Sequence, residues 1–351
     1  MNKEYRDFYD ALCFTQAQKE EIAALAAEEA MNTAKQKSGG FFRMGRIAAA
    51  AACLAAVLTV SAEAAGIPTP LSEVIGPLFG GSIAQCEVID KIGYPVNAGD
   101  TDNGVTVTAE AVIGDRYNAC VVFSFSRDDG QPILPEDVPV QALQLGGLGD
   151  VDLIRMGESH GFARFVDLVP GDHEIHYLYC VSADAPLNRG TAKVSFEDLY
   201  AYPEFGEDSV KILEGTWKFR FEVDYGDSSV SLGGGETFRQ GGMNFTITEI
   251  LLSPIAVQVS YEVDQEVQWS DAPSGRLPEE DRRQVEEYLE NVQLQLNKKD
   301  GTVVDLTTYA GGSIRPENGR SYCTKGTVLE EIIPLEELES IAVGDIVYPI
   351  D

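Results

Sequence analysis

The chain has 351 residues, of which 44% are hydrophobic and 24% are charged, so it can bury a core and wholesale disorder is excluded. This length argues for two domains of ordinary size with additional segments. The net charge of −31 lies entirely beyond residue 46, because residues 1–46 carry seven basic and seven acidic side chains. Such an acidic surface repels phosphate backbones, so direct nucleic-acid binding is not expected.

Residues 1–40 predict a helical hairpin. Apolar side chains recur at i, i+3, i+4 and i+7 in its first half, and a capping box of Thr15 and Gln18 begins the second helix. A hairpin this small cannot bury both faces, so one stripe is expected to contact another protein, the membrane surface or a second copy. The alternative is that the two helices only pack on each other. The candidate partner-binding residues on these stripes are Tyr5, Phe8, Tyr9, Leu12, Ile22 and Leu25.

Residues 41–66 predict a transmembrane helix with a basic inner flank. The stretch Ile47–Ala62 is uncharged and rich in alanine, and it needs its flanks to reach across a bilayer. The positive-inside rule places the N-terminus in the cytoplasm and the C-terminal region outside the cell. Two alternatives are a cleaved signal peptide, with Ala62-Glu63-Ala64 as its cleavage site, and a buried helix of a soluble protein. The basic residues before the span are Lys35, Lys37, Arg43 and Arg46.

Residues 67–81 predict a short amphipathic helix directly after the span. Pro68 and Pro70 end the preceding helix, and Gly80-Gly81 ends this one. Its apolar face is expected either to lie on the bilayer or to cap the external region. The residues of that face are Leu71, Val74, Ile75, Leu78 and Phe79.

From about Cys86 onward the hydrophobic period changes to two, which predicts a mainly β fold. We expect two Ig-like antiparallel β-sandwiches, at residues 82–226 and 236–351, joined by the Gly/Ser-rich stretch 227–235. A helix over 277–289 is expected as an insertion between strands. The expected strands are 104–112, 117–125, 162–169, 174–181, 217–223, 243–252, 255–263, 292–296 and 302–306, with a final strand near 327–333.

The six cysteines are widely scattered and show no zinc-ligand spacing. Cys13 and Cys53 fall in the expected cytoplasmic and membrane segments. The other four are either isolated thiols or form up to two external disulfides. These four are Cys86, Cys120, Cys180 and Cys323.

The sequence nominates no catalytic or metal site. His173 and His176 lie three positions apart, which places them on opposite faces of a strand, and we interpret them as ordinary exposed histidines. The segment Asp100–Gly104 has the beginning of a calcium loop, but its glycine comes one position early, so we interpret it as a tight turn into the next strand. No enzymatic activity and no cofactor are expected.

Several stretches resemble a family of Gram-positive membrane proteins known by domain of unknown function 4179, which is described as anti-sigma-factor-like. The resemblance implies a cytoplasmic segment for an extracytoplasmic-function sigma factor, one membrane span, and an external sensing region of two Ig-like sandwiches. The chain departs from zinc-containing anti-sigma domains because it has no His/Cys/Cys cluster. The stretches that carry the resemblance are Phe14–Lys19, the Ala-rich span, Ile67–Phe79, Asp102–Thr108 with Asp115, Gly215–Phe219 and Leu252–Pro254.

Two functions follow as hypotheses. In the first, the hairpin holds a sigma factor until the external region senses an envelope signal. In the second, the acidic sandwiches form an adhesion or envelope-binding module that contacts an unknown envelope ligand, and the hairpin has no regulatory role. The expected partners are accordingly a sigma factor, the lipid bilayer and an envelope ligand.

Overall fold

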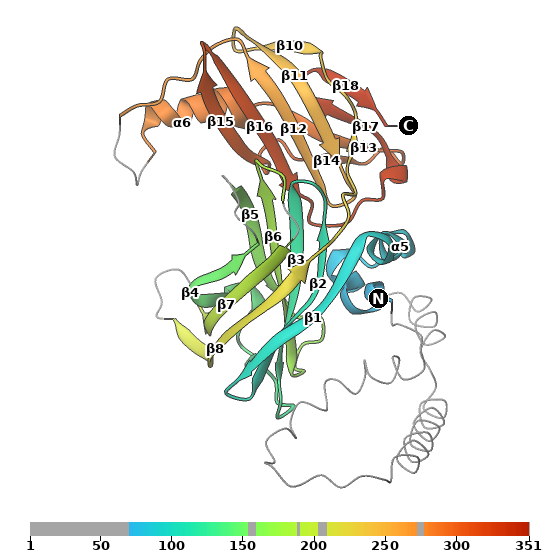
Figure 1. Ribbon diagram of the computed structural model, residues 1–351, viewed down its shortest axis with the longest axis vertical. Coiled ribbons are helices and arrows are strands. Elements are labelled where there is room, and N and C mark those ends of the chain that lie inside the picture. The colour runs from blue at the N-terminus through green and yellow to red at the C-terminus, as the bar shows by residue number, and fades with distance from the viewer. Residues whose placement is uncertain (1–69, 154–158, 188–189, 203–208, 272–276, 351) are drawn as a thin grey trace. The chain divides into compact units, whose positions relative to one another are not determined.

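A computed structural model describes residues 70–153, 159–187, 190–202, 209–271 and 277–350. The chain divides into two units, residues 1–69 and 70–351, and all described residues belong to the second. This unit is mainly β with antiparallel sheets, which confirms the expected class at that level (Figure 1). Within the described residues, none of the helices is long and apolar enough to cross a membrane. The expected hairpin of residues 1–40 and span of residues 41–66 lie outside the described residues.

The second unit begins with short helices. Helix α4 (Leu71–Ile75) leads into the 3-10 helix η1 (Gly76–Phe79), and α5 (Ile83–Ile92) follows. Ser82 and Gln85 form a capping box at the start of α5, which satisfies backbone donors that the first turn leaves without partners.

The strands that follow form two antiparallel sheets around one core. The five-stranded sheet has the order β1-β2-β3-β6-β5, and the three-stranded sheet has the order β4-β7-β8. The first sheet contains β1 (Gly93–Asp102), β2 (Val105–Gly114), β3 (Asn118–Arg127), β5 (Ser159–Val166) and β6 (Glu174–Ala183), and the second contains β4 (Leu143–Asp152), β7 (Gly190–Ala201) and β8 (Val210–Val223), with η2 (Val140–Ala142) before β4.

Alternating apolar side chains of these strands meet between the two sheets. Trp217 is fully buried there, with its ring centroid 5.8 Å from that of Phe125. The indole Nε1 donates a hydrogen bond of 2.9 Å to the carbonyl of Val105, so its polar group is satisfied inside the core.

The segment Asp100–Gly104, which has the beginning of a calcium loop in its sequence, lies where the two sheets join. Asn103 and Gly104 connect β1 to β2 and both have positive φ, as a type I′ hairpin turn requires. The carboxylates of Asp102 and Asp100 accept hydrogen bonds of 2.8 Å each from the backbone N–H groups of Thr216 and Lys218 in β8. These acidic side chains therefore hold the edge of the second sheet against the first.

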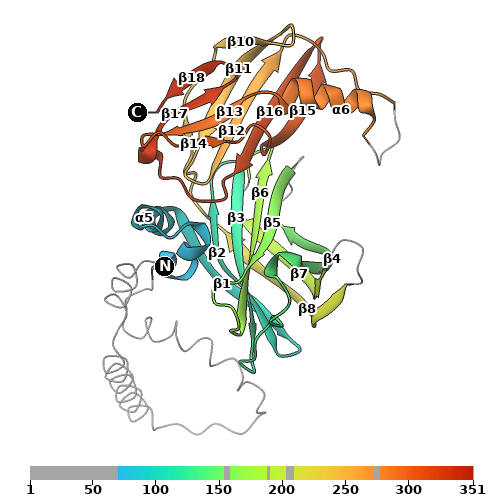
Figure 2. The same cartoon turned by 180° about the vertical axis from the view of Figure 1, so that it is seen from behind.

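A second pair of sheets encloses another core, and Figures 1 and 2 show it from opposite sides. One sheet has the order β10-β11-β12-β16-β15 with β9 beside β11, and the other has the order β14-β13-β17-β18. The elements are β9 (Val230–Ser231), β10 (Thr237–Gln240), β11 (Met243–Leu252), β12 (Ala256–Val263), α6 (Glu279–Val285), the π-helix η3 (Glu286–Glu290), β13 (Leu294–Lys298), β14 (Val303–Asp305), β15 (Gly311–Glu317), β16 (Arg320–Val328), η4 (Leu335–Glu337), β17 (Leu338–Val343) and β18 (Ile346–Pro349).

A buried lysine holds the end of η3. Lys325 of β16 is only 1% exposed, and its Nζ donates to the carbonyls of Leu289, Val292 and Thr307 at 2.7 Å and of Glu290 at 3.1 Å. Burial lowers the pKa of Lys325 to about 8, so the ammonium group is still charged at pH 7. Carbonyl oxygens at the end of a helix carry partial negative charge and stabilise this cation.

We call the sheets of β1–β8 and those of β9–β18 the first and second sandwich-like parts. A third cluster of buried side chains joins these two parts and the N-terminal helices. It includes Ile75 and Phe79 from the helices, Val122 from β3, and Ala256 and Ile332 from the second part. The side chain of Gln85 also donates a 2.9 Å hydrogen bond to the carbonyl of Ile332. The apolar face expected after the span is therefore buried in protein within residues 70–350.

Two predicted elements differ from the structure. The expected final strand at 327–333 is wrong, because β16 ends at Val328 and two further strands, β17 and β18, complete the second sheet. The expected linker 227–235 is also partly wrong, since Val230 and Ser231 pair with the end of β11. The predicted helix within 277–289 is present as α6 and continues into η3.

Candidate functional site

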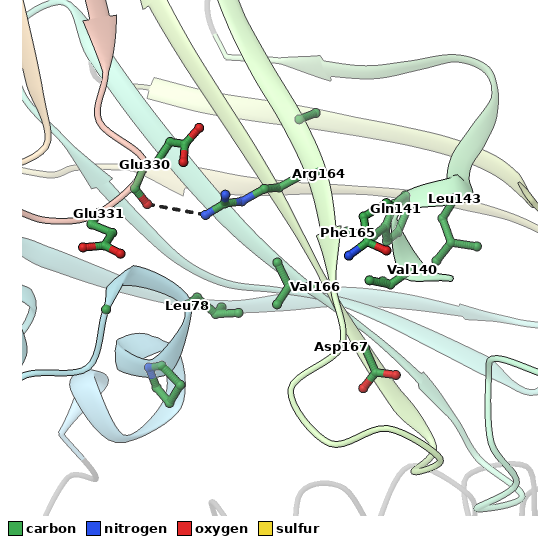
Figure 3. Close-up of a pocket in the computed structure, with 13 residues that line it drawn as sticks. Leu78, Val140, Gln141, Leu143, Arg164, Phe165, Val166, Asp167, Glu330 and Glu331 are labelled. Atoms are coloured by element: carbon green, nitrogen blue, oxygen red, sulfur yellow. Dashed lines mark hydrogen bonds between the residues drawn. The ribbon is translucent and has the colours of Figure 1, made fainter. Parts of the chain in front are cut away.

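A cavity of about 590 Å³ lies where the N-terminal helices, the edge strand β5 and the loop after β16 meet (Figure 3). Leu78 of η1 and Val166 of β5 supply apolar wall, and Arg164 projects from β5 across the opening. Glu330 and Glu331 come from the loop that follows β16. These three walls come from segments more than 80 positions apart in the sequence, and residues 140–143 complete the lining.

Arg164 is the cationic group of this cavity. Its Nη2 donates a 3.4 Å hydrogen bond to the backbone carbonyl of Glu330, and its guanidinium carbon lies 5.8 Å from the centre of the Phe162 ring. The Nε atom is buried and has no hydrogen-bond partner among the described residues. A buried donor without a partner is costly in free energy, and this nitrogen is one that the described residues leave unsatisfied.

Three acidic residues line the same cavity. Asp167 lies at the end of the β5 wall, opposite Glu330 and Glu331 (Figure 3). Burial, followed by the nearby Asp172, raises the pKa of Asp167. A guanidinium in a cavity that acidic residues also line can orient a polar or zwitterionic group, but the cavity walls supply no nucleophile paired with a base.

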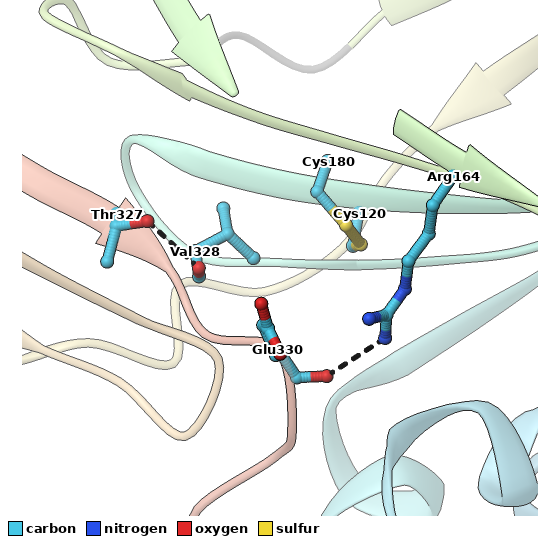
Figure 4. Close-up of a disulfide and its surroundings, with 6 residues drawn as sticks. All are labelled: Cys120, Arg164, Cys180, Thr327, Val328 and Glu330. Carbon is cyan, nitrogen blue, oxygen red and sulfur yellow. Dashed lines mark hydrogen bonds between the residues drawn. A yellow bond between two sulfur atoms is a disulfide. The ribbon is translucent and has the colours of Figure 1, made fainter. Parts of the chain in front are cut away.

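A disulfide lies on the same sheet, beside Arg164 (Figure 4). Cys120 of β3 and Cys180 of β6 are directly opposite each other in the antiparallel register, and their sulfurs are bonded. Of the two disulfides that the sequence allows, the described residues contain this one. Cys86 and Cys323 are free thiols there, and burial raises the pKa of Cys323 to about 12, which makes it unreactive at neutral pH.

A polar cluster lies further along β2, β3 and β6. The Ser124 hydroxyl donates a 2.5 Å hydrogen bond to Glu110, and Nε2 of His176 is 3.5 Å from a carboxylate oxygen of Glu174. Burial raises the pKa of both glutamates and lowers that of His176. Because Ser124 donates to Glu110 and not to His176, these residues do not form a Ser-His-carboxylate triad.

His176 corrects one sequence-based interpretation. It is only 7% exposed, whereas the strand pattern alone suggested an ordinary surface histidine. Residues 105–125 and 174–181 form the centre of a sheet that the N-terminal helices and the second sandwich-like part cover, so its outer face is also buried. Within the described ranges, no group of three His, Cys, Asp or Glu side chains is arranged to hold a metal ion.

The structure does not test the residues predicted to bind a partner. Tyr5, Phe8, Tyr9, Leu12, Ile22 and Leu25 all lie outside the described residues. The sequence did not nominate Arg164, Asp167, Glu330 or Glu331. The sequence offered one signal for this site, a charged residue on an apolar strand face. Arg164 lies between Phe162 and Val166 on the face of β5 that packs against the third cluster.

The comparisons with known proteins are sparse. No family model matches the chain, and no curated protein matches it. Among solved structures, it is similar to "The crystal structure of the conserved domain protein from Bacillus anthracis", with a TM-score of 0.42 and 14% sequence identity. That similarity covers 72% of this chain and 76% of the other.

Proposed function

We propose that the chain is a membrane-anchored regulator that resembles an anti-sigma factor, with residues 70–350 as its external sensing region. In this proposal residues 1–40 form a cytoplasmic helical hairpin that binds a sigma factor, residues 41–66 span the bilayer, and the two sandwich-like parts are Ig-like. The resemblance to the family of domain of unknown function 4179 supports it, as does the cluster of basic residues before the expected span.

The observation that carries the proposal is the burial of the segment that directly follows the expected span. Ile75, Leu78 and Phe79 are at most 5% exposed, and they pack against side chains from both sandwich-like parts. A passive tether would not need this burial. A ligand that changed the packing around Leu78 would act directly on the segment leading to the membrane, which is the coupling that a sensor requires.

The chemistry of residues 70–350 supports a location outside the cytoplasm. The Cys120–Cys180 disulfide persists in an oxidising compartment and is rare in the cytosol. The strong negative charge is also confined to the part of the chain after residue 46, whereas residues 1–46 are neutral overall. This difference is expected if the membrane separates the two parts.

Two measurements on the full-length chain, tagged at its C-terminus, test the proposal. Protease added to intact protoplasts should remove the tag, and cross-linked capture should recover a sigma factor that is lost when residues 3–34 are deleted. A tag that resists protease until the cells are lysed would contradict the topology, and capture without any sigma factor would contradict the regulatory role.

Coupling through the buried segment has its own test. Leu78→Ala should change sigma-dependent transcription in cells, because it opens space beside the cavity of Figure 3. Leu277→Ala is the matched control, since Leu277 is 47% exposed. Equal transcription in both variants, at equal protein levels, would favour the alternative function, an envelope-binding module without regulation.

A further inference from the structure

The outer face of the sheet that contains β12, β16 and β15 carries a row of hydroxyl groups. Ser260, Thr324 and Ser313 lie directly opposite one another across these three strands. The hydroxyls of Ser313 and Thr324 are 2.9 Å apart. The row faces away from the second core, because the alternate residues Tyr261 and Cys323 are buried in that core. Hydroxyls held in a row offer both donors and acceptors to a polar ligand.

Aromatic side chains border this row. Trp269 is 40% exposed and lines a cavity of about 610 Å³ together with Tyr322 and the three hydroxyl residues. The guanidinium carbon of Arg315 lies 5.6 Å from the centre of the Tyr322 ring, which holds that ring in place. The volume is within the range of ligand-binding pockets, and the exposed indole provides a flat apolar surface beside polar groups.

A smaller cavity beside this one contains an amide with a missing hydrogen-bond partner. A second cavity of about 180 Å³ shares Asp184, Ser313 and Thr324 with the first, so the two adjoin as one groove. Gln258 lines the second cavity and is only 6% exposed. Its Oε1 is buried and has no hydrogen-bond partner among the described residues.

The orientation of the Gln258 amide follows from its neighbour. Its Nε2 is 3.5 Å from the carbonyl oxygen of Ala183, and the reversed orientation would set two oxygens against each other. The orphan atom is therefore an acceptor that needs a donor. Buried polar atoms in native proteins are almost always satisfied, so a bound O–H or N–H group is the natural partner of this oxygen.

We propose that this groove, lined by Gln258, Ser260, Trp269, Ser313, Tyr322 and Thr324, binds an uncharged oligosaccharide. Sugar hydroxyls match the hydroxyl row and donate to Oε1 of Gln258, while the apolar face of a sugar ring packs on Trp269. An anionic polymer fits poorly, because the chain carries a net charge of −31 and Arg315, which lines the groove, forms an ion pair with Glu317. The inference names a ligand class for the external region proposed above and rests on that proposal only for the natural source of the glycan.

The two tryptophans of the chain allow a direct binding assay on the full-length protein. Trp217 is fully buried, so acrylamide quenches mainly the fluorescence of Trp269. Tetra-N-acetylchitotetraose and cellotetraose serve as uncharged probes, and polyphosphate serves as the anionic control. At least one of the sugars should protect the fluorescence from quenching, and polyphosphate should not.

Variants separate a ligand contact from a structural role. Gln258→Met should weaken sugar binding about tenfold, the equivalent of one lost hydrogen bond of ~1.4 kcal/mol, without lowering the melting temperature. Trp269→Ala should abolish binding measured by calorimetry, and Leu277→Ala should leave it unchanged.

Three results would overturn the proposal. The first is that neither sugar binds at about 10 mM. The second is that polyphosphate binds and the sugars do not. The third is that the wild type, Trp269→Ala and Gln258→Met bind the sugar with equal affinity. None of these results bears on the protease or sigma-factor experiments, so the two proposals fail separately.

Discussion

Replacing Lys325 by methionine should remove the group that holds the end of η3. The side chain keeps its approximate length and apolar stem, but the ammonium group is lost. Four backbone carbonyls, those of Leu289, Glu290, Val292 and Thr307, then lose a charged donor within 3.1 Å. The variant therefore tests whether a charge buried at 1% exposure stabilises the second core or only occupies space in it.

The magnitude follows from these acceptors. The carbonyl of Leu289 also accepts from the N–H of Val292 and stays partly satisfied. The other three have no other partner among the described residues, and an unsatisfied buried acceptor costs about 1–3 kcal/mol, with a smaller cost for the part-buried carbonyls of Glu290 and Thr307. Relaxation and the better burial of methionine offset part of that sum. We expect a loss of about 3–5 kcal/mol in the free energy of unfolding, as measured when one partner of a buried charged pair is removed.

Urea denaturation of the full-length protein, followed by circular dichroism and tryptophan fluorescence, measures this loss. Lys298→Met is the matched control in the same sandwich-like part, because Lys298 forms a surface ion pair of 2.8 Å with Glu337. The free energy of unfolding of this control should fall by less than about 1 kcal/mol. If Lys325→Met proved as stable as Lys298→Met, the reasoning about the carbonyl cluster would be refuted.

Three further predictions concern the first sandwich-like part. Glu110→Gln should raise the melting temperature at pH 7.5, because burial raises the pKa of Glu110 and makes its charge costly in the folded state. The gain should vanish below about pH 4.5, where the glutamate is protonated in the unfolded state too. An equal gain at both pH values would contradict this reasoning. Replacing both Cys120 and Cys180 by alanine should cost about 4 kcal/mol, since the disulfide closes a loop of 60 residues, and denaturation with and without reductant measures it. Asp100→Ala and Asp102→Ala should each cost about 1 kcal/mol and speed hydrogen exchange at the β8 amides that they cap; unchanged exchange would argue against the capping role.

Strands with a clear two-residue alternation could be predicted from the sequence. Strand β11 has the bounds expected for it, 243–252, because its buried side chains alternate with exposed ones around a single bulge. Several strands were missed, among them β1, β4, β7 and β15. Strand β1 contains Pro95, Gly99 and a bulge with Asn97 at positive φ, and β15, at the end of its sheet, has Ile314 as its one large apolar side chain. Edge strands tolerate such residues, so local composition resembles that of a loop.

The candidate site could not be predicted, for a different physical reason. Leu78, Arg164 and Glu330 meet only after strands far apart in the sequence have paired and the two sandwich-like parts have packed together. No local spacing encodes such a meeting. Lys325 shows the same limit, because a lysine in a strand predicts an exposed face, and only the fold brings four carbonyls around it.

The shared cluster of Ile75, Phe79, Val122, Ala256 and Ile332 has a consequence for cooperativity. A boundary drawn at the Gly/Ser-rich stretch separates two hydrophobic cores, yet a fragment cut there would expose apolar side chains that the intact chain buries. Neither fragment should melt as the parent does, and each should be prone to association. We therefore expect residues 70–350 to be the smallest unit that folds on its own, with the first helices packed against both sandwich-like parts.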